Sequence, residues 1–168
     1  VTLVNASVSV EPPMFVDVVN VTSAADMADV VKSKAAEQDI IIMTAAVADF
    51  CPSHPADEKI KKNDSSYESV IELERTEDIL SYLGAHKAKG QLICGFSMET
   101  QNMLENSKAK LAKKNADMIV ANNLKVAGAG FGTDTNVVTL ITADDCTELE
   151  IMDKSCVAAR IMDRLLKM

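Results

Sequence analysis

The stretch DIIIMT, residues 39–44, decides the fold class of this chain. Its apolar residues follow one another without alternation, which is typical of a strand covered on both faces in a parallel sheet. Two further strands are predicted by QLICGFS at residues 91–97 and ADMIVAN at residues 116–122. Helical patterns separate these runs, and alternating strands and helices indicate an α/β fold with a doubly wound, mostly parallel, Rossmann-like sheet.

The flanking segments extend this pattern in both directions. We expect strands at residues 1–5, 15–21 and 68–76, a hairpin from residues 137–142 and 147–151, and helices at residues 23–38, 76–90, 98–115 and 153–168. Ser23 and Asp26 form a capping-box-like start for the first helix, and Thr76 is expected to cap the second. The 168 residues suit one domain, with a charged flap inserted after residue 44.

Composition limits the classes of partner. The net charge of −8 argues against general binding to nucleic acid or to an anionic membrane. Four cysteines without a C-x-x-C pair and two histidines argue against a zinc site. No apolar run reaches the ~18 residues of a membrane span, and no signal peptide opens the sequence. We therefore expect a cytoplasmic protein with reduced thiols.

Ligands of doubly wound sheets bind at the carboxyl ends of the strands. That rule selects the loop after IIIMT, the turn after ICGF, the ANN after MIV and the approach to TEDIL. A dinucleotide fingerprint would need a glycine-rich turn that opens a helix. The glycine cluster AGAGFG at residues 127–132 instead precedes a strand-like run, so a Rossmann-type reductase is the least favoured class.

Cationic side chains in two separate segments could meet an anionic ligand. Lys110 and Lys114 share one helix face, although a helix C-terminus also favours lysine for its dipole alone. Lys59 follows the long charged segment AAVADFCPSHPAD and could reach a phosphate, or could simply be solvated. Asp49 could bind a ribose hydroxyl or a metal, or form a turn. Phe96 could face a base or pack in the core. Together these residues suggest a nucleoside triphosphate with its Mg²⁺.

The motifs MTAAVADF, EKIKK, TEDIL, GFSMET, KAKLAKKNADMIVANN and GFGTDTNVVTLI, in this order, resemble bacterial phosphopantothenoylcysteine synthetase. That enzyme is often the C-terminal half of a bifunctional coenzyme A biosynthesis protein. The resemblance covers nearly the whole chain. It implies a ligase that joins 4′-phosphopantothenate to L-cysteine through an acyl-cytidylate, converting CTP to CMP and pyrophosphate with Mg²⁺.

The resemblance also implies roles for particular residues. Ala45 and Ala46 would line the substrate pocket, and Lys59 would be the catalytic lysine of a flexible flap. The nucleotide would be bound by residues from four segments, which are Asp49, Lys59, Arg75, Thr76, Glu77, Asp78, Phe96, Lys110 and Lys114. No residue is predicted to be a metal ligand. The family implies a homodimer, with the region of EKIKK contributing to the contact.

The chain departs from the family at its start. Family members begin with a glycine-rich strand and loop that lead to an SSGKMG-like helix start, and nothing in this sequence matches it. We therefore expect a synthetase domain that lacks this segment, with no FMN and no decarboxylase half, although the chain could be fused to or associated with one. The alternative is a non-catalytic nucleotide-binding or regulatory module of the same fold.

Overall fold

A computed structural model describes residues 1–6, 8, 10–56, 58–59, 70–99, 102–123 and 132–168. The chain divides into two compact units, and each is described by itself. The first contains Val1–Val30 and Ala46–Asp78, and the second contains Val31–Ala45 and Ile79–Met168. Within the described residues, no helix is long and apolar enough to cross a membrane.

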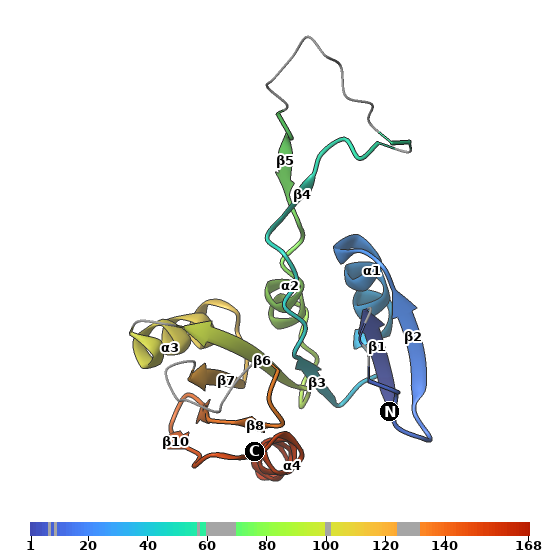
Figure 1. Cartoon of the computed structure of the whole chain (residues 1–168). Helices are drawn as coiled ribbons and strands as arrows, with labels where there is room; N and C mark the ends of the chain where they lie inside the picture. Colours follow the sequence, from blue (N-terminus) through green and yellow to red (C-terminus); the bar gives the residue numbers. More distant parts are fainter. Residues whose placement is uncertain (7, 9, 57, 60–69, 100–101, 124–131) are drawn as a thin grey trace. The chain divides into compact units, whose positions relative to one another are not determined.

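The second unit is built on a mixed five-stranded sheet of order β10-β9-β7-β6-β3 (Figure 1). Within this sheet the adjacent strands β3, β6 and β7 run parallel to one another, whereas β9 is antiparallel to both β7 and β10. The strands are β3 Ile40–Met43, β6 Leu92–Glu99, β7 Met118–Asn123, β9 Val138–Ile141 and β10 Cys146–Glu148. A separate antiparallel pair is formed by β8, Thr135–Asn136, which precedes β9 in the chain, and β11, Met152–Asp153, which follows β10. The helices are α2 Ile79–Ala85, α3 Met103–Lys113 and α4 Lys154–Leu165. The predicted α/β class is confirmed.

Alternation along the strands sends side chains to two different helices. Cys94 and Val120 belong to one core cluster with Ile161 of α4. Ser97, of opposite parity in β6, instead meets Ser107 of α3. Since successive side chains of a strand point to opposite faces, α3 and α4 cover opposite faces of the sheet. Burial and the nearby Asp117 carboxylate raise the pKa of the Cys94 thiol to about 12.

The first unit contains a parallel pair and a hairpin. Strand β1, Thr2–Ala6, pairs with β2, Asp17–Val21. Strand β4, Phe50–Pro52, pairs antiparallel with β5, Leu73–Arg75. Helix α1, Ala24–Ala35, begins in this unit.

The predicted capping box at the start of α1 is confirmed. The Ser23 N–H donates to Asp26 Oδ2 at 2.9 Å, and the Asp26 N–H donates to Ser23 Oγ at 3.1 Å. Bonds from Thr22 and Ser23 lower the pKa of the Asp26 carboxyl, because they favour its charged form.

Three sequence predictions are wrong in detail. Thr76 does not cap α2, which begins three residues later, because its N–H donates to the Asp49 carbonyl and its hydroxyl to the Ala48 carbonyl. Helix α3 begins at Met103 rather than residue 98, because β6 continues to pair with β7 up to Glu99. Strand β3 is an edge strand of the five-stranded sheet and is only half-buried, whereas DIIIMT predicts burial on both faces.

Candidate functional site

Lys110 lies against the carboxyl-terminal half of β6. Its Nζ donates to the Phe96 carbonyl oxygen at 2.9 Å, and both residues are half-buried. An ammonium group has three N–H donors, so this bond leaves donors that can meet an anion. The structure therefore brings together two of the residues predicted to bind nucleotide, in the carboxyl-terminal half of the strand, and ligands of such sheets bind beyond the carboxyl ends of the strands.

Lys114 reaches a different anchor from the same helix face. Its Nζ donates to Ser81 Oγ of α2 at 2.9 Å. Lys110 and Lys114 are four residues apart, which is the spacing of one helix face, and Lys114 is the C-cap residue of α3. Their ammonium groups are nevertheless held by separate elements, β6 for Lys110 and α2 for Lys114. Sequence reasoning missed Ser81, although it directly follows the TEDIL motif.

A buried hydroxyl pair lies beside Lys110. Ser97 Oγ and Ser107 Oγ are 2.8 Å apart and link β6 to α3. Ser107 is completely buried, and Leu111, one turn later in α3, is 7% exposed. The sequence signal for this contact is weak, since it consists of one serine in an apolar strand and one serine on a helix face.

Two asparagines meet at the carboxyl end of β7. Asn136 Nδ2 donates to Asn122 Oδ1 at 2.9 Å, and Asn136 Oδ1 accepts the Val137 N–H at 2.9 Å. The strand-end rule already points to the ANN motif that contains Asn122. The partner Asn136 comes from β8 and could not be inferred from spacing.

The first unit holds the other group of predicted residues. Asp49 is exposed, and its carbonyl accepts the Thr76 N–H at 3.0 Å, so these two residues are neighbours. The Arg75 guanidinium lies over the Phe50 ring, 5.4 Å from its centroid, a cation–π contact across the β4–β5 hairpin. Glu77 and Asp78 are exposed.

The remaining predicted residues are also exposed. Ala45 lies in the second unit, and Ala46 and Lys59 lie in the first. The rest of the lysine motif EKIKK, from residue 60 onward, falls outside the described residues, and so does part of the loop GAGFGTDTN. The predicted roles of Ala45, Ala46, Asp49 and Lys59 remain predictions.

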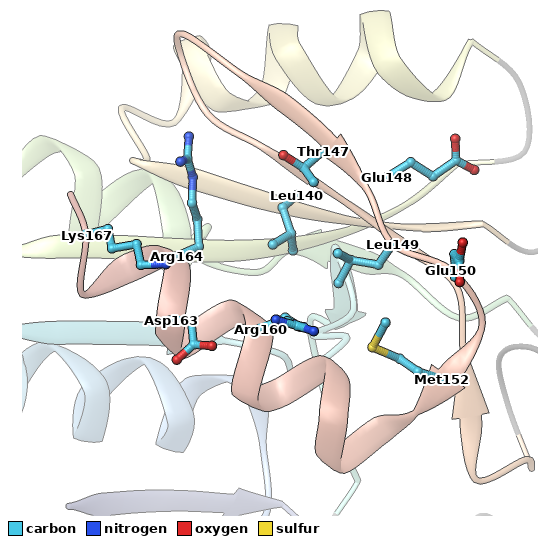
Figure 2. Close-up of a pocket in the computed structure, with 10 residues that line it drawn as sticks. All are labelled: Leu140, Thr147, Glu148, Leu149, Glu150, Met152, Arg160, Asp163, Arg164 and Lys167. Atoms are coloured by element: carbon cyan, nitrogen blue, oxygen red, sulfur yellow. The ribbon is translucent and has the colours of Figure 1, made fainter.

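A cavity of about 460 Å³ lies elsewhere in the second unit, between α4 and the β9–β10 hairpin (Figure 2). Leu140, Leu149 and Met152 form its apolar part. Its cations are Arg160 and Arg164 of α4 and Lys167, which follows that helix, and Arg164 is bound to Asp145 at 3.3 Å. None of the residues predicted to bind substrate or nucleotide lines it. Basic residues near a helix C-terminus are explained by the helix dipole.

Comparison with known families shows to which family the chain belongs. Residues 1–168 match the family described as DNA/pantothenate metabolism flavoprotein C-terminal domain. The chain belongs to this family. The resemblance found in its motifs is thereby confirmed at the level of the family, because the match covers every motif used.

Relatives of known name connect this family to coenzyme A biosynthesis. The chain is 45% identical over 167 residues to Coenzyme A biosynthesis bifunctional protein CoaBC of Bacillus subtilis (strain 168), covering 98% of this chain and 40% of that protein. It is 44% identical over 168 residues to a Cysteine/Cysteine sulfinic acid decarboxylase from an unknown prokaryotic organism, covering 99% of this chain and 46% of that protein. The chain thus spans less than half the length of either relative.

Solved structures support the fold. The crystal structure of the C-terminal domain of Coenzyme A biosynthesis bifunctional protein CoaBC matches with a TM-score of 0.80 and 40% identity, covering 99% of this chain and 75% of that one. The DNA/pantothenate metabolism flavoprotein from Streptococcus pneumoniae matches with a TM-score of 0.79 at 16% identity, which supports the fold alone.

Proposed function

We propose that this chain is a synthetase domain, residues 1–168, that joins 4′-phosphopantothenate to L-cysteine with CTP, the second step of coenzyme A biosynthesis from pantothenate. The observation that carries the proposal is the 45% identity, over 98% of the chain, to a protein named for coenzyme A biosynthesis. Lys110 of α3, whose ammonium is bound to the Phe96 carbonyl of β6, supports the proposal, because the reaction needs cations beside a triphosphate.

The proposed reaction has two steps. A carboxylate oxygen of 4′-phosphopantothenate attacks the α-phosphorus of CTP, and the bond to pyrophosphate breaks. The amino group of cysteine then attacks the acyl carbon of the acyl-cytidylate, CMP leaves, and the nitrogen loses a proton. Negative charge gathers on the leaving pyrophosphate in the first step and on the CMP phosphate in the second, so fixed cations favour both.

Lys110 and Lys114 are the groups to which the proposal gives this electrostatic role. The described residues include an anchoring oxygen for each ammonium, which is the carbonyl of Phe96 for Lys110 and the hydroxyl of Ser81 for Lys114. Anchored cations cost little rearrangement when charge develops, which is the condition for effective transition-state stabilisation. The Phe96 segment is proposed to contact the nucleotide beside Lys110.

The residues of the first unit receive their roles from the resemblance. Asp49 and the segment of residues 75–78 are proposed to contact the nucleotide. The small side chain of Ala46, like that of Ala45 in the second unit, would let backbone N–H groups approach the substrate. Lys59 is proposed as the catalytic lysine, and its exposed position is compatible with a group that moves onto bound substrate.

Mg²⁺ is proposed to arrive with CTP. Magnesium in nucleotide sites is held largely by substrate phosphates and water. Within the described residues, no group of three or more His, Cys, Asp or Glu could hold a metal ion, and the proposal assigns Mg²⁺ no protein ligands. It likewise assigns this chain no FMN, and it expects a homodimer and a decarboxylase domain as partner.

Pyrophosphate release tests the proposal. The chain is incubated with Mg²⁺, CTP and 4′-phosphopantothenate, and release is followed with and without L-cysteine, while mass spectrometry detects the cysteine amide. We expect release that requires both CTP and 4′-phosphopantothenate. Binding of CTP without any turnover would instead favour the non-catalytic module, and thermal stabilisation by NADPH but not CTP would favour a reductase.

A substitution separates catalysis from binding. Lys59→Ala is expected to lower pyrophosphate release and amide formation while CTP still raises the melting temperature. Lys89→Ala, which removes an exposed lysine that has no proposed role, is the matched control. Unchanged turnover in Lys59→Ala would remove Lys59 from the mechanism.

A further inference from the structure

The contact between Ser97 and Ser107 joins β6 to α3 immediately beside Lys110. The two hydroxyl oxygens are 2.8 Å apart, and the residues are 3% and 0% exposed. Phe96, whose carbonyl accepts the bond from Lys110, directly precedes Ser97. Lys110 lies three residues after Ser107, so both are on one helix face. The serine contact and the lysine bond are therefore adjacent on one helix–strand seam, which Figure 1 shows as α3 beside β6.

The size of these two residues sets how closely the helix can approach the strand. Protein interiors are close-packed, so a buried position has no room for added methyl groups. Extra atoms at such a position force neighbouring side chains or backbone to move. A larger side chain at Ser107 must therefore lift this part of α3 away from β6. Lys110 moves with the helix, and its ammonium then leaves the Phe96 carbonyl.

We propose that Ser97 and Ser107 are positioning residues, which hold α3 close enough to β6 for Lys110 to present its ammonium at the nucleotide site. The inference rests on the proposed function, because it takes Lys110 as a group that binds the triphosphate. Close approach is the property that matters, so alanine at both positions preserves the position of Lys110 and a β-branched side chain at position 107 destroys it.

The first measurement needs no nucleotide. Acetic anhydride labels lysine amines, and mass spectrometry gives the rate at each site, with the exposed Lys108 as internal reference. In Ser107→Val we expect Lys110 to be labelled about fivefold faster relative to Lys108, the factor represented by one typical net hydrogen bond. The double variant Ser97→Ala/Ser107→Ala should keep the native ratio. Ala109→Val is the matched control, since it adds the same branched side chain at an exposed position of α3.

The second measurement is the affinity for CTP with Mg²⁺, by calorimetry. Ser107→Val should bind about tenfold more weakly, because small misplacements of a binding group carry large penalties. The alanine double variant and Ala109→Val should bind like the parent chain. Ser107→Thr, which adds one methyl and keeps the hydroxyl, should lie in between, and it replaces the valine variant if that one does not fold.

The two measurements separate the possible failures. If the parent chain binds no CTP, the proposed function fails, and the labelling rates still decide the positioning role. Native labelling of Lys110 in folded Ser107→Val or Ser107→Thr would overturn the inference, because the serines would then contribute only to stability.

Discussion

Gly84→Ala is expected to destabilise the second unit, although alanine normally strengthens a helix. A Cβ at Gly84 would lie 1.8 Å from the carbonyl oxygen of Lys114, and real Cβ atoms essentially never approach within 3.0 Å. Helix α2 and the end of α3 must therefore separate by at least the 1.2 Å difference. That movement also strains the bond from Asn115 Nδ2 to the Gly84 carbonyl, which is 2.7 Å long.

The magnitude follows from two opposing effects. Replacing glycine by alanine within a helix contributes about 1 kcal/mol of stability. Overpacking a well-packed site costs about 1 to 3 kcal/mol, and more where the clashing atom is backbone, as it is at Gly84. We therefore expect a net loss of about 2 kcal/mol in the free energy of unfolding, from a cost of about 3 kcal/mol and a gain of about 1 kcal/mol.

Urea unfolding followed by circular dichroism measures this loss as a lower midpoint at an unchanged slope. Gly90→Ala is the control, because a Cβ there meets nothing within 4 Å and suffers only from the positive φ of 84°. Its expected cost is about 1 to 2 kcal/mol, from backbone conformation alone. If Gly84→Ala unfolded at the same urea concentration as the parent chain, or a higher one, the close approach of α2 to Lys114 would be refuted.

Three further predictions concern charge and reactivity. Asp26→Asn should destabilise α1 at pH 7. Because the folded pKa of Asp26 is lowered, the difference from the parent chain should shrink as pH falls below the ordinary value of 3.8 and vanish below the folded pKa; urea midpoints at pH 7 and over a series of pH values below 3.8 measure this. Iodoacetamide at pH 8 should label the exposed Cys146 and leave Cys94, whose pKa is raised to about 12, unlabelled in the folded chain; equal labelling would contradict its burial. Asp117→Ala should lower the free energy of unfolding, measured with urea, by about 2 to 3 kcal/mol, because the Ile93 N–H, which lies 2.7 Å from this carboxylate, loses a charged acceptor. An unchanged urea midpoint would show that the bond adds no stability.

The sequence predicts elements well where the cause is local. The reciprocal bonds of Ser23 and Asp26 depend on three-residue spacing, and they occur as expected. Thr76 has the right residue type for a helix cap, but its hydrogen bonds go to residues 48 and 49, which are distant in sequence. The half-buried state of β3 likewise depends on its place at the edge of the sheet, which an apolar run does not encode.

The candidate site likewise has features that local sequence predicts and features that depend on tertiary packing. Helical spacing predicts that Lys110 and Lys114 share one face. Their anchors, the Phe96 carbonyl and the Ser81 hydroxyl, depend on how α3 packs on β6 and α2, which no local pattern specifies. The buried meeting of Ser97 with Ser107 is a further example of a contact that only the packed structure reveals.

The strand β10 has a consequence for how the chain behaves at high concentration. Among the described residues it is the outer strand of the five-stranded sheet, with exposed side chains, and an outer strand can pair with a strand of another molecule. Only three residues are in strand conformation there, and Glu148 ends the strand with Glu150 close behind. A short edge with like charges opposes stacking of one copy on the next, so this side of the sheet is protected against aggregation by strand addition.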